Sequence, residues 1–320
     1  MADAVALKPR KPQSTPASAA DAKSSASNTP TAPDETSVPT RAFAMLSDRG
    51  RVRHSNQDAC AALPEHGVFV VCDGMGGAAG GEVASHLATE AFLGRLAHSH
   101  CPASGPAATR PRARLAEAIR AANQAVYRHS RKLPSLHGMG TTLVALLWDD
   151  EAQRPEDVPT SPRLWIAHVG DSRCYLFRSG ELHQLTEDHS LVEEQVRAGV
   201  LSRVQATASP MRNIITRAIG SQSTVEPEIA SHAAQSGDLY LLASDGLTRE
   251  LDDEEIAQIL GCTAGPAELA AACRDSDRRN YATAGTALQA ALDTACHALV
   301  EASNAKGGRD NITVLLVACP

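Results

Sequence analysis

From about residue 41 onward, short apolar runs alternate with longer alanine-rich runs. Apolar runs bounded by glycine or polar turn residues predict strands at 42–45, 68–72, 141–148, 164–169, 174–177, 182–185, 238–243 and 312–318. Alanine-rich runs with apolar residues along one face predict helices at 82–97, 112–132, 252–260 and 286–305. Strands of both alternating and continuous type, with helices grouped in pairs, indicate an α+β fold in which antiparallel sheets are covered by helices.

The same pattern divides the chain into regions. Residues 1–40 are rich in Ala, Ser, Thr and Pro and poor in large apolar side chains, which predicts a disordered tail ahead of one domain at 41–320. Residues 188–220 are polar and weakly periodic, and so long a stretch between strands is usually functional, often a lid. Residues 262–285 carry many charges and predict a surface insertion.

The composition limits the classes of binding partner and the cellular compartment that we expect. The chain has 320 residues, 43% of them hydrophobic, a formal net charge of -7 and a pI near 5.9, which argues against nucleic acid or an anionic membrane surface as the main partner. Eight scattered cysteines without a Cys-x-x-Cys pair favour reduced thiols. No apolar run approaches the ~20 residues that cross a bilayer, so we expect a cytoplasmic protein.

A glycine-rich turn follows the strand at 68–72, directly after Asp73. Such a turn brings bare backbone against either a pyrophosphate or a metal ion. The run from Gly74 to Ala79 nearly matches the dinucleotide fingerprint, but Asp73 would repel the phosphates. The acid needed at the tip of the next strand is missing, and a second helical run follows the first without an intervening strand. A hard cation is the favoured interpretation.

Four aspartates adjoin predicted strands in the same way: Asp73, Asp171, Asp245 and Asp310. One such residue is ordinary turn chemistry, but four of them would repel one another if the strand ends met, and cations would remove that conflict. Carboxylates and a free carbonyl at Gly74 are oxygen ligands suited to Mg²⁺ or Mn²⁺. Two such ions ~3.5–4 Å apart activate water for hydrolysis of a phosphoester.

A phosphate also needs a directional positive partner, which arginine supplies through two parallel donors. Arg49, Arg51 and Arg53 alternate in one polar turn and share a side if it is extended. The pattern does not choose among the three.

Ordered motifs between residues 41 and 318 resemble those of the metal-dependent protein phosphatase 2C family, in its bacterial branch. They are Ser47-Asp48-x-Gly50-x-x-Arg53-x-x-Asn56-Gln57-Asp58, Asp73-Gly74-Met75-Gly76-Gly77, Gly140-Thr141-Thr142, Gly170-Asp171-Ser172-Arg173, Thr186-x-Asp188-His189-Ser190, Arg212-Asn213-x-x-Thr216-Arg217-x-x-Gly220, Ser244-Asp245-Gly246 and Gly308-x-Asp310-Asn311. The resemblance implies a β-sandwich flanked by helix pairs, in α-β-β-α layers, with two Mn²⁺ or Mg²⁺ ions in a cleft at one edge.

The resemblance also implies the ligands of those ions. Asp73 would bridge both ions and the Gly74 carbonyl would bind one of them. Asp245 and Asp310 would hold the other ion, and Asp171 resembles the ligand of a weaker third ion.

The same resemblance implies roles for residues that do not bind metal, and some positions of the chain differ from the family pattern. Arg53 would grip the substrate phosphate and Asp58 would order metal-bound water. Gln57 stands where many eukaryotic members have Glu. Met75 replaces their general-acid His, and a thioether donates no proton. Arg249 stands where members often have a second acid near the third ion, which leaves the occupancy of that site open.

The implied function is that of a bacterial, monomeric, Mn²⁺- or Mg²⁺-dependent phosphatase. It would act on phosphoserine and phosphothreonine in proteins and oppose a Ser/Thr protein kinase. Two alternatives stay open: a catalytically weak phosphoprotein-binding module, which would be expected to lack metal carboxylates, and a small-molecule phosphoesterase on the same scaffold. His189 has two interpretations, orienting a metal-bound water or fixing the base of the segment at 188–220.

Overall fold

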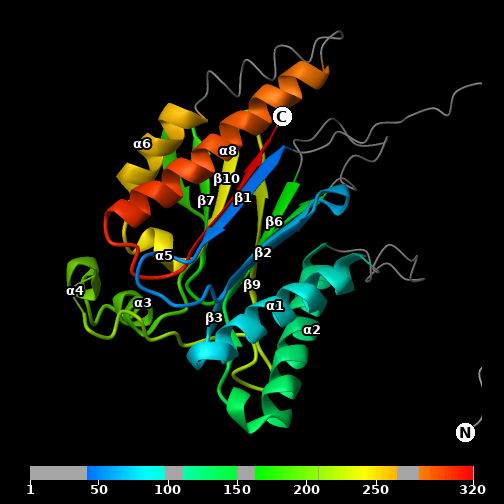
Figure 1. The fold of residues 1–320 in the computed structure, drawn as a ribbon, viewed down its shortest axis with the longest axis vertical. Helices are drawn as coiled ribbons and strands as arrows, with labels where there is room; N and C mark the ends of the chain where they lie inside the picture. Colours follow the sequence, from blue (N-terminus) through cyan, green and yellow to red (C-terminus); the bar gives the residue numbers. More distant parts are fainter. Residues whose placement is uncertain (1–41, 98–110, 150–162, 208, 265–280, 320) are drawn as a thin grey trace, which may run out of the picture. The chain divides into compact units, whose positions relative to one another are not determined.

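Two antiparallel β-sheets stack face to face in the computed structural model, and helices cover the outer face of each sheet (Figure 1). The structure describes residues 42–97, 111–149, 163–207, 209–264 and 281–319. The predicted tail at 1–40 and most of the predicted insertion at 262–285 therefore lie outside the described residues. None of the helices in the described part is long and apolar enough to cross a membrane.

The first sheet has five strands. In spatial order they are β1 (Phe43–Asp48), β11 (Ile312–Ala318), β10 (Leu239–Ala243), β7 (Arg173–Arg178) and β8 (Glu181–Gln184). Asp48 pairs with Ile312, and Ala243 pairs with both Val314 and Arg173. This register brings the loops that follow β1 and β10 and precede β11 to one end of the sheet.

The second sheet forms the other half of the sandwich. Its strands are β2 (Asp58–Leu63), β3 (Val68–Met75), β5 (Leu143–Asp149), β6 (Arg163–Val169) and β9 (Glu228–Ala233), with the short β4 (Gly140–Thr141) paired to β3. Asp58 lies opposite Asp73, and Leu143 lies opposite Val169.

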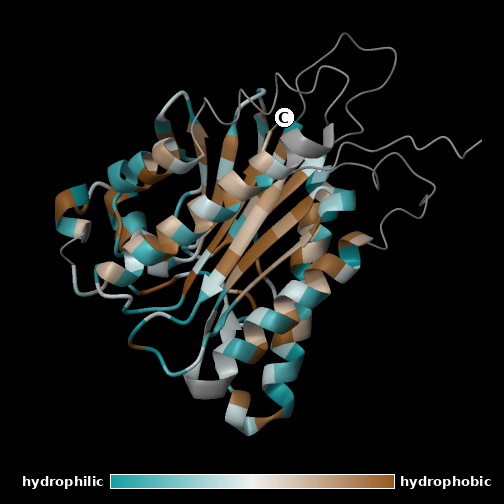
Figure 2. Cartoon of the chain, turned by 45° about the horizontal axis from the view of Figure 1, so that its top comes forward, coloured by the Kyte–Doolittle hydropathy of each residue, from teal (hydrophilic) through white to brown (hydrophobic). Residues whose placement is uncertain are grey.

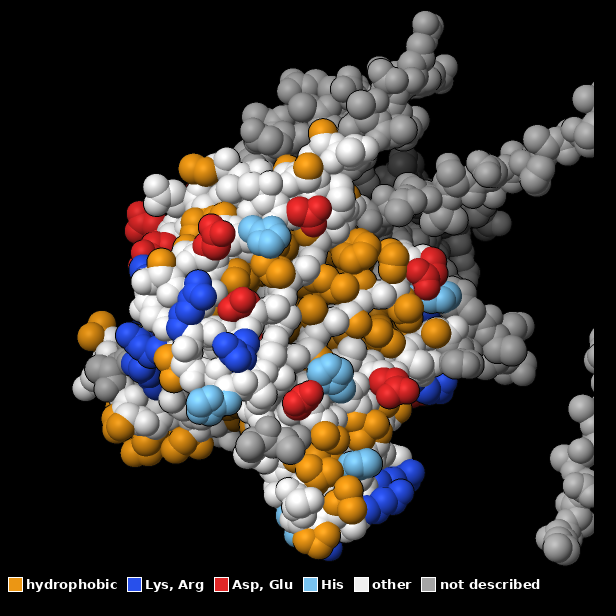
Figure 3. Space-filling view, viewed as in Figure 1, with side chains coloured by type: hydrophobic (Ala, Val, Ile, Leu, Met, Phe, Trp, Pro, Cys, Tyr) orange, Lys and Arg blue, Asp and Glu red, His pale blue; other side chains and the backbone are white. Residues whose placement is uncertain are grey.

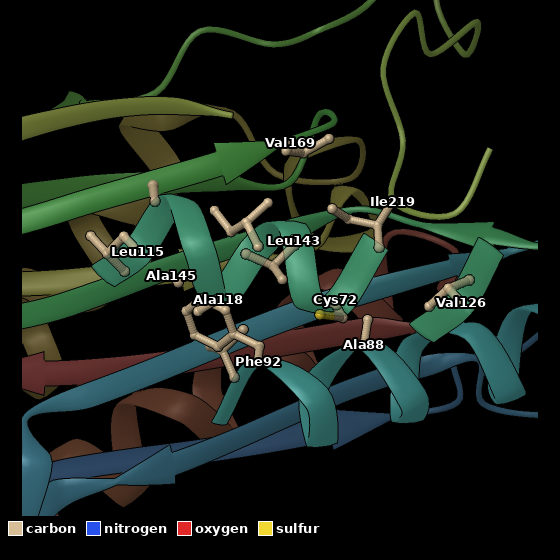
Figure 4. Close-up of a cluster of buried hydrophobic side chains, with 14 of the residues drawn as sticks. Cys72, Ala88, Phe92, Leu115, Ala118, Val126, Leu143, Ala145, Val169 and Ile219 are labelled. Carbon is tan, nitrogen blue, oxygen red and sulfur yellow. The ribbon is translucent and has the colours of Figure 1, made fainter. Parts of the chain in front are cut away.

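Each sheet packs against one pair of helices. The helices are α1 (Gly77–Ala97) and α2 (Pro111–Lys132) on the second sheet, with α6 (Asp253–Thr263) and α8 (Tyr281–Ala305) on the first. On α2 the buried Leu115, Ile119 and Val126 recur at helical spacing, and they meet Phe92 and Leu143 in the cluster drawn in Figure 4. Helix α6 starts at a capping box formed by Asp252 and Glu255.

The layer between the sheets is apolar on both sides. Phe69 and Val71 from β3 pack against Leu176, Tyr240 and Leu315 of the first sheet, and the strands appear brown in Figure 2. Because continuous apolar strands can be buried on both faces, this layer explains runs such as the one at 68–72. The α+β sandwich with flanking helix pairs is confirmed.

Several elements differ from the sequence pattern. Strands β2 and β9 were not predicted, because one is built largely of small residues and the other is a mostly exposed edge strand. Within 188–220 the structure has two short helices, α3 (Leu191–Arg197) and α4 (Arg203–Thr207). Helix α1 begins at Gly77, five residues before the predicted start, although glycine is a poor helix former.

Candidate metal centre

The acids from both sheets converge on one cleft. Its lining includes Arg53, Asp73, Gly74, Asp245 and Asp310. Asp73 lies on β3 of the second sheet, whereas Asp245 comes just after β10 and Asp310 just before β11 of the first sheet. Chain segments more than 150 residues apart in sequence therefore meet here because the two sheets end at the same edge.

Asp58 ties the two sheets together below the cleft. Its Oδ2 accepts hydrogen bonds from Ser244 Oγ at 2.8 Å, just after β10, and from Thr313 Oγ1 at 2.7 Å, on β11 of the first sheet. Asp58 itself lies on β2, directly opposite Asp73. The carboxylate is thus fixed through one oxygen while it stands beside the predicted bridging acid.

The backbone at Gly74 tolerates no side chain. A Cβ there would lie 2.1 Å from the Gly81 carbonyl oxygen and 2.4 Å from that of Gln57. A Cβ at Gly81 would in turn come within 2.7 Å of the Gly74 carbonyl oxygen. The close approach of β3 to α1 therefore requires a glycine at position 81.

Four buried carboxylates in or beside the cleft have a raised pKa. Burial raises the pKa of Asp58 to about 6, of Asp245 to about 6 and of Asp171 to about 7. Burial, and then the neighbouring carboxylates led by Asp245, raise the pKa of Asp73 well above its ordinary value. Desolvation and like-charge repulsion act in the same direction here.

Three of these acids each have a buried oxygen without a hydrogen-bond partner in the described part of the chain: Asp58 Oδ1, Asp171 Oδ1 and Asp245 Oδ1. A buried carboxylate oxygen without a hydrogen-bond donor lowers the stability of the fold. The presence of three such oxygens close together therefore needs an explanation. A divalent cation satisfies such oxygens, and an all-oxygen donor set suits Mg²⁺ or Mn²⁺. The residues present fit the predicted metal ions.

Of the three candidate arginines, the structure brings Arg53 to the acids. Its Nη2 donates to Asp310 Oδ2 at 2.7 Å, and about half of its side chain is exposed. Arg49 instead donates from Nη1 to the His54 carbonyl at 3.4 Å. The backbone N–H of Arg51 donates to the Gly308 carbonyl at 2.7 Å, which joins this turn to the loop before β11.

Arg249 also reaches into the acid cluster. It lies four residues after Asp245 on α5 (Asp245–Thr248) and its C-cap, and its guanidinium forms a close ion pair with that carboxylate. Its nitrogens lie 3.7 Å from Asp171 Oδ2 and 3.6 Å from Asp310 Oδ2. One guanidinium therefore faces three of the acids that the sequence assigned to metal binding.

The residues that begin the segment at 188–220 are fixed from outside the cleft. Arg173 donates from Nε and Nη2 to the two oxygens of Asp188 at 2.9 and 2.8 Å. His189 contacts Glu228 through Nε2 at 3.0 Å, and its carbonyl accepts from the Thr216 N–H at 2.8 Å. These contacts favour the interpretation of His189 as a residue that fixes the base of this segment.

Two positioning residues were present in the sequence motifs without an assigned role. Asn311 accepts from the Gln57 N–H at 2.9 Å and donates to the carbonyls of Arg49 and Ser55, both at 2.9 Å. Thr142 Oγ1 accepts from the Asp73 N–H at 2.9 Å. Both residues hold the backbone that presents the acids, and this role cannot be seen in the sequence because it depends on contacts between loops far apart in the chain.

The sequence of the chain is similar to those of known proteins. Residues 49–300 match a family described as Protein phosphatase 2C. Serine/threonine protein phosphatase PstP of Mycobacterium tuberculosis is 35% identical over 274 residues, which is 86% of this chain and 44% of PstP, so the chain spans less than half the length of that relative. Serine/threonine phosphatase stp of Listeria monocytogenes is 33% identical over 274 residues, covering 85% of this chain and 93% of that protein.

Solved structures give the same picture. The crystal structure of M. tuberculosis PstP/Ppp has 34% sequence identity and a TM-score of 0.66, covering 87% of this chain and 98% of that one. The serine/threonine phosphatase of S. agalactiae has 31% identity and a TM-score of 0.68, covering 88% and 100%. The catalytic domain of PstP in complex with 2 manganese ions has 33% identity and a TM-score of 0.63, covering 87% and 99%.

Proposed function

The chain belongs to the protein phosphatase 2C family, and from that premise we propose that it hydrolyses phosphoserine and phosphothreonine in proteins with the help of Mn²⁺ or Mg²⁺. The proposal depends on the buried carboxylate oxygens at the converging strand ends that have no hydrogen-bond partner in the described part of the chain, together with Arg53, which contacts the neighbouring Asp310. The combination provides a place for cations next to a place for phosphate.

Asp73, the Gly74 carbonyl, Asp245 and Asp310 would hold two ions. When bound, these ions lower the pKa of water and neutralise the charge that develops on the phosphoryl group. Asp171 would be the ligand of a third ion, but the Arg249 guanidinium already lies 3.7 Å from it. Arg249 would supply a fixed positive charge at this end of the cleft.

The chain's own residues would bind the phosphate and direct the water. Arg53 would exchange its contact with Asp310 for two parallel hydrogen bonds to a phosphoryl group. Asp58, held through Oδ2, would accept a hydrogen bond from water at its partnerless Oδ1. Met75 lines the cleft but has no proton to donate, so the leaving oxygen would be protonated by water.

The surroundings of the cleft favour a protein substrate over a small molecule. Val52, on the cleft wall, is 61% exposed, and Val204 on α4 is 81% exposed. Met211 and Ile214, in the segment next to the cleft, are each 47% exposed. Apolar side chains also gather over α4 at the lower left of Figure 3. Exposed apolar groups beside a polar site provide contacts for a polypeptide.

We also propose domain limits for the chain and the setting in which it acts. The catalytic domain would comprise residues 41–320, with a movable flap at 188–220, an insertion at 262–285 and a tail at 1–40. The protein would act as a cytoplasmic monomer that opposes a Ser/Thr protein kinase, as expected for a bacterial phosphatase of this family.

A panel of phosphopeptides assayed with Mn²⁺, with Mg²⁺ and with a chelator tests the proposal. We expect turnover of phosphoserine and phosphothreonine peptides that either ion supports and that the chelator abolishes. Calorimetric titration separates the weak binding module, which should bind fewer than about two divalent ions per chain. Turnover of small phosphoesters without turnover of any peptide would instead support the hypothesis of a small-molecule phosphoesterase.

A further inference from the structure

Two guanidiniums from different parts of the fold approach the same carboxylate oxygen. Asp310 Oδ2 lies 2.7 Å from Arg53 Nη2 and 3.6 Å from Arg249 Nη1. Arg53 belongs to the polar turn after β1, whereas Arg249 is the C-cap of α5, which follows β10. Two positive groups therefore share one acid that is also expected to bind a cation.

The side chain of Arg249 lies where two cavities adjoin. One cavity is the metal cleft, which Arg53 and Asp310 also line. The other lies between α5 and the segment at 188–220, with Asp171 in its wall. Arg249 lines both cavities, and 30% of its side chain is exposed although it is ion-paired. A ligand in the cleft can therefore reach this guanidinium.

One end of the Arg249 guanidinium has an anchor outside the expected pair of metal ions. Its Nη2 forms the close ion pair with Asp245 and lies 3.7 Å from Asp171 Oδ2. Asp245 would become a ligand of the two ions, whereas the resemblance assigns Asp171 only to a weaker third ion. A third ion would meet the positive charge of Arg249 at this place. Asp171 can therefore hold Nη2 while Nη1 faces the cleft.

Both guanidiniums would exchange partners when the cleft is loaded. A carboxylate that shares its charge with a divalent ion attracts arginine less strongly. A phosphoryl group instead brings negative charge and three terminal oxygens, which are good acceptors for arginine donors. Two parallel hydrogen bonds from Arg53 would use two of these oxygens. One oxygen remains for a second donor, and Arg249 Nη1 already approaches the Asp310 oxygen that Arg53 would give up.

We propose that Arg249 is a second phosphate-binding catalytic residue, which donates through Nη1 to the phosphoryl group that Arg53 grips. Asp171 is then a positioning residue, because it holds Nη2 and so directs the guanidinium. The proposal rests on the proposed phosphatase function and adds a residue to it. Two arginines from separate loops would bind one phosphoryl group.

A purely competitive role for Arg249 leads to a different expectation. If this arginine only competed with cations for the acids, its removal would tighten the binding of metal ions and would not weaken the binding of phosphate. If it also contacts phosphate, Arg249→Ala should tighten metal binding and weaken phosphate binding. The two effects have opposite signs, so phosphate binding at saturating metal separates the two roles.

Calorimetric titration of inorganic phosphate into the Mg²⁺-saturated full chain tests the proposal. We expect Arg249→Ala to weaken phosphate binding by roughly 10- to 100-fold, as Arg53→Ala should, because each loses a charge-assisted contact. Arg249→Lys keeps the charge without the planar pair of donors and should recover part of the loss. Arg197→Ala is the matched control. Arg197 is ion-paired with Glu187, has a side chain 39% exposed and lines neither cavity, so its loss should leave phosphate binding unchanged.

The proposal is overturned if Arg249→Ala binds phosphate as tightly as the unaltered chain while Arg53→Ala binds it more weakly, and the proposed phosphatase function would survive that result. An unaltered, Mg²⁺-saturated chain that binds no phosphate would contradict the function itself. Asp171→Asn tests the positioning role. It should weaken phosphate binding in the unaltered chain and have no further effect in Arg249→Ala, because it acts through that arginine. Additive effects would show that Asp171 does not position Arg249.

Discussion

The buried acids at the two ends of strand β10 differ in how completely the chain satisfies their hydrogen bonds. Asp238, just before the strand, accepts from Arg178 Nε and Nη2, both at 2.6 Å, and from the Gln235 N–H at 2.8 Å and Tyr240 Oη at 3.1 Å. Asp245, just after the strand, has a buried Oδ1 without a partner in the described part, and its pKa is raised to about 6.

The contrast separates an acid that serves the fold from one that serves chemistry. A buried carboxylate closed by its own donors is satisfied by the chain alone. At the other end, Arg249 faces three acids and Arg53 pairs with one of the three, which still leaves carboxylate oxygens without a partner in the described part of the chain. We attribute the difference to metal binding, and the variants below test it.

The largest effect is expected at the open end. Asp245→Asn removes a ligand charge, and hydrolysis of a phosphothreonine peptide with Mn²⁺ should fall by roughly a thousandfold or more, ~4 kcal/mol in the activation free energy. The metal-free fold should be retained, because the substitution also removes like-charge repulsion. Initial rates and urea unfolding provide the measurements. Retained hydrolysis would remove Asp245 from the site.

Asp238→Asn should have the reverse profile. Arg178 and Tyr240 lose their charged acceptor, so the free energy of unfolding should fall by about 2–4 kcal/mol, less than for a fully buried pair because Arg178 can be hydrated. Below the melting temperature, kcat should not change. Urea titration and a rate assay on the folded variant test both expectations. A large fall in kcat would break the comparison between the two ends.

A smaller effect separates substrate binding from metal binding within the cleft. Arg53→Ala should raise KM for the phosphopeptide by roughly 10- to 100-fold with a much smaller change in kcat, because the lost contact is made in ground state and transition state alike. Steady-state kinetics measures the split. Arg49→Ala is the control from the same turn and should change neither constant. An equal effect of both substitutions would mean that the turn acts through its overall charge.

The smallest effect concerns the arginine at the open end. Arg249→Ala removes a cation that competes for the same acids, so Mn²⁺ binding in the cleft should tighten several-fold. Arg249→Asp should go further and raise the number of bound ions from about two to about three. Calorimetric titration counts them. Weaker binding in Arg249→Ala would show that this arginine supports the metal site.

The elements that the sequence predicts well are those whose signal is local. Strands such as β3 and β11 are continuous apolar runs, and α2 repeats its buried residues at helical spacing. Strand β9 escaped because it lies at a sheet edge, where most of its side chains are exposed and the pattern is weak.

The same distinction applies to the site. Asp73, Asp245 and Asp310 could be singled out because each adjoins an apolar strand, and the family resemblance supplied their roles. The choice of Arg53 over its neighbours depends on the path of a turn, and the contacts of Arg249 depend on helix α5 facing two other loops.

Anomalous scattering from a crystal grown with Mn²⁺ tests the central claim most directly. We predict two peaks ~3.5–4 Å apart, bridged by Asp73 and bounded by the Gly74 carbonyl, Asp245 and Asp310. A well-ordered crystal in which these acids surround no manganese peak, while the protein still hydrolyses phosphopeptides, would contradict the account.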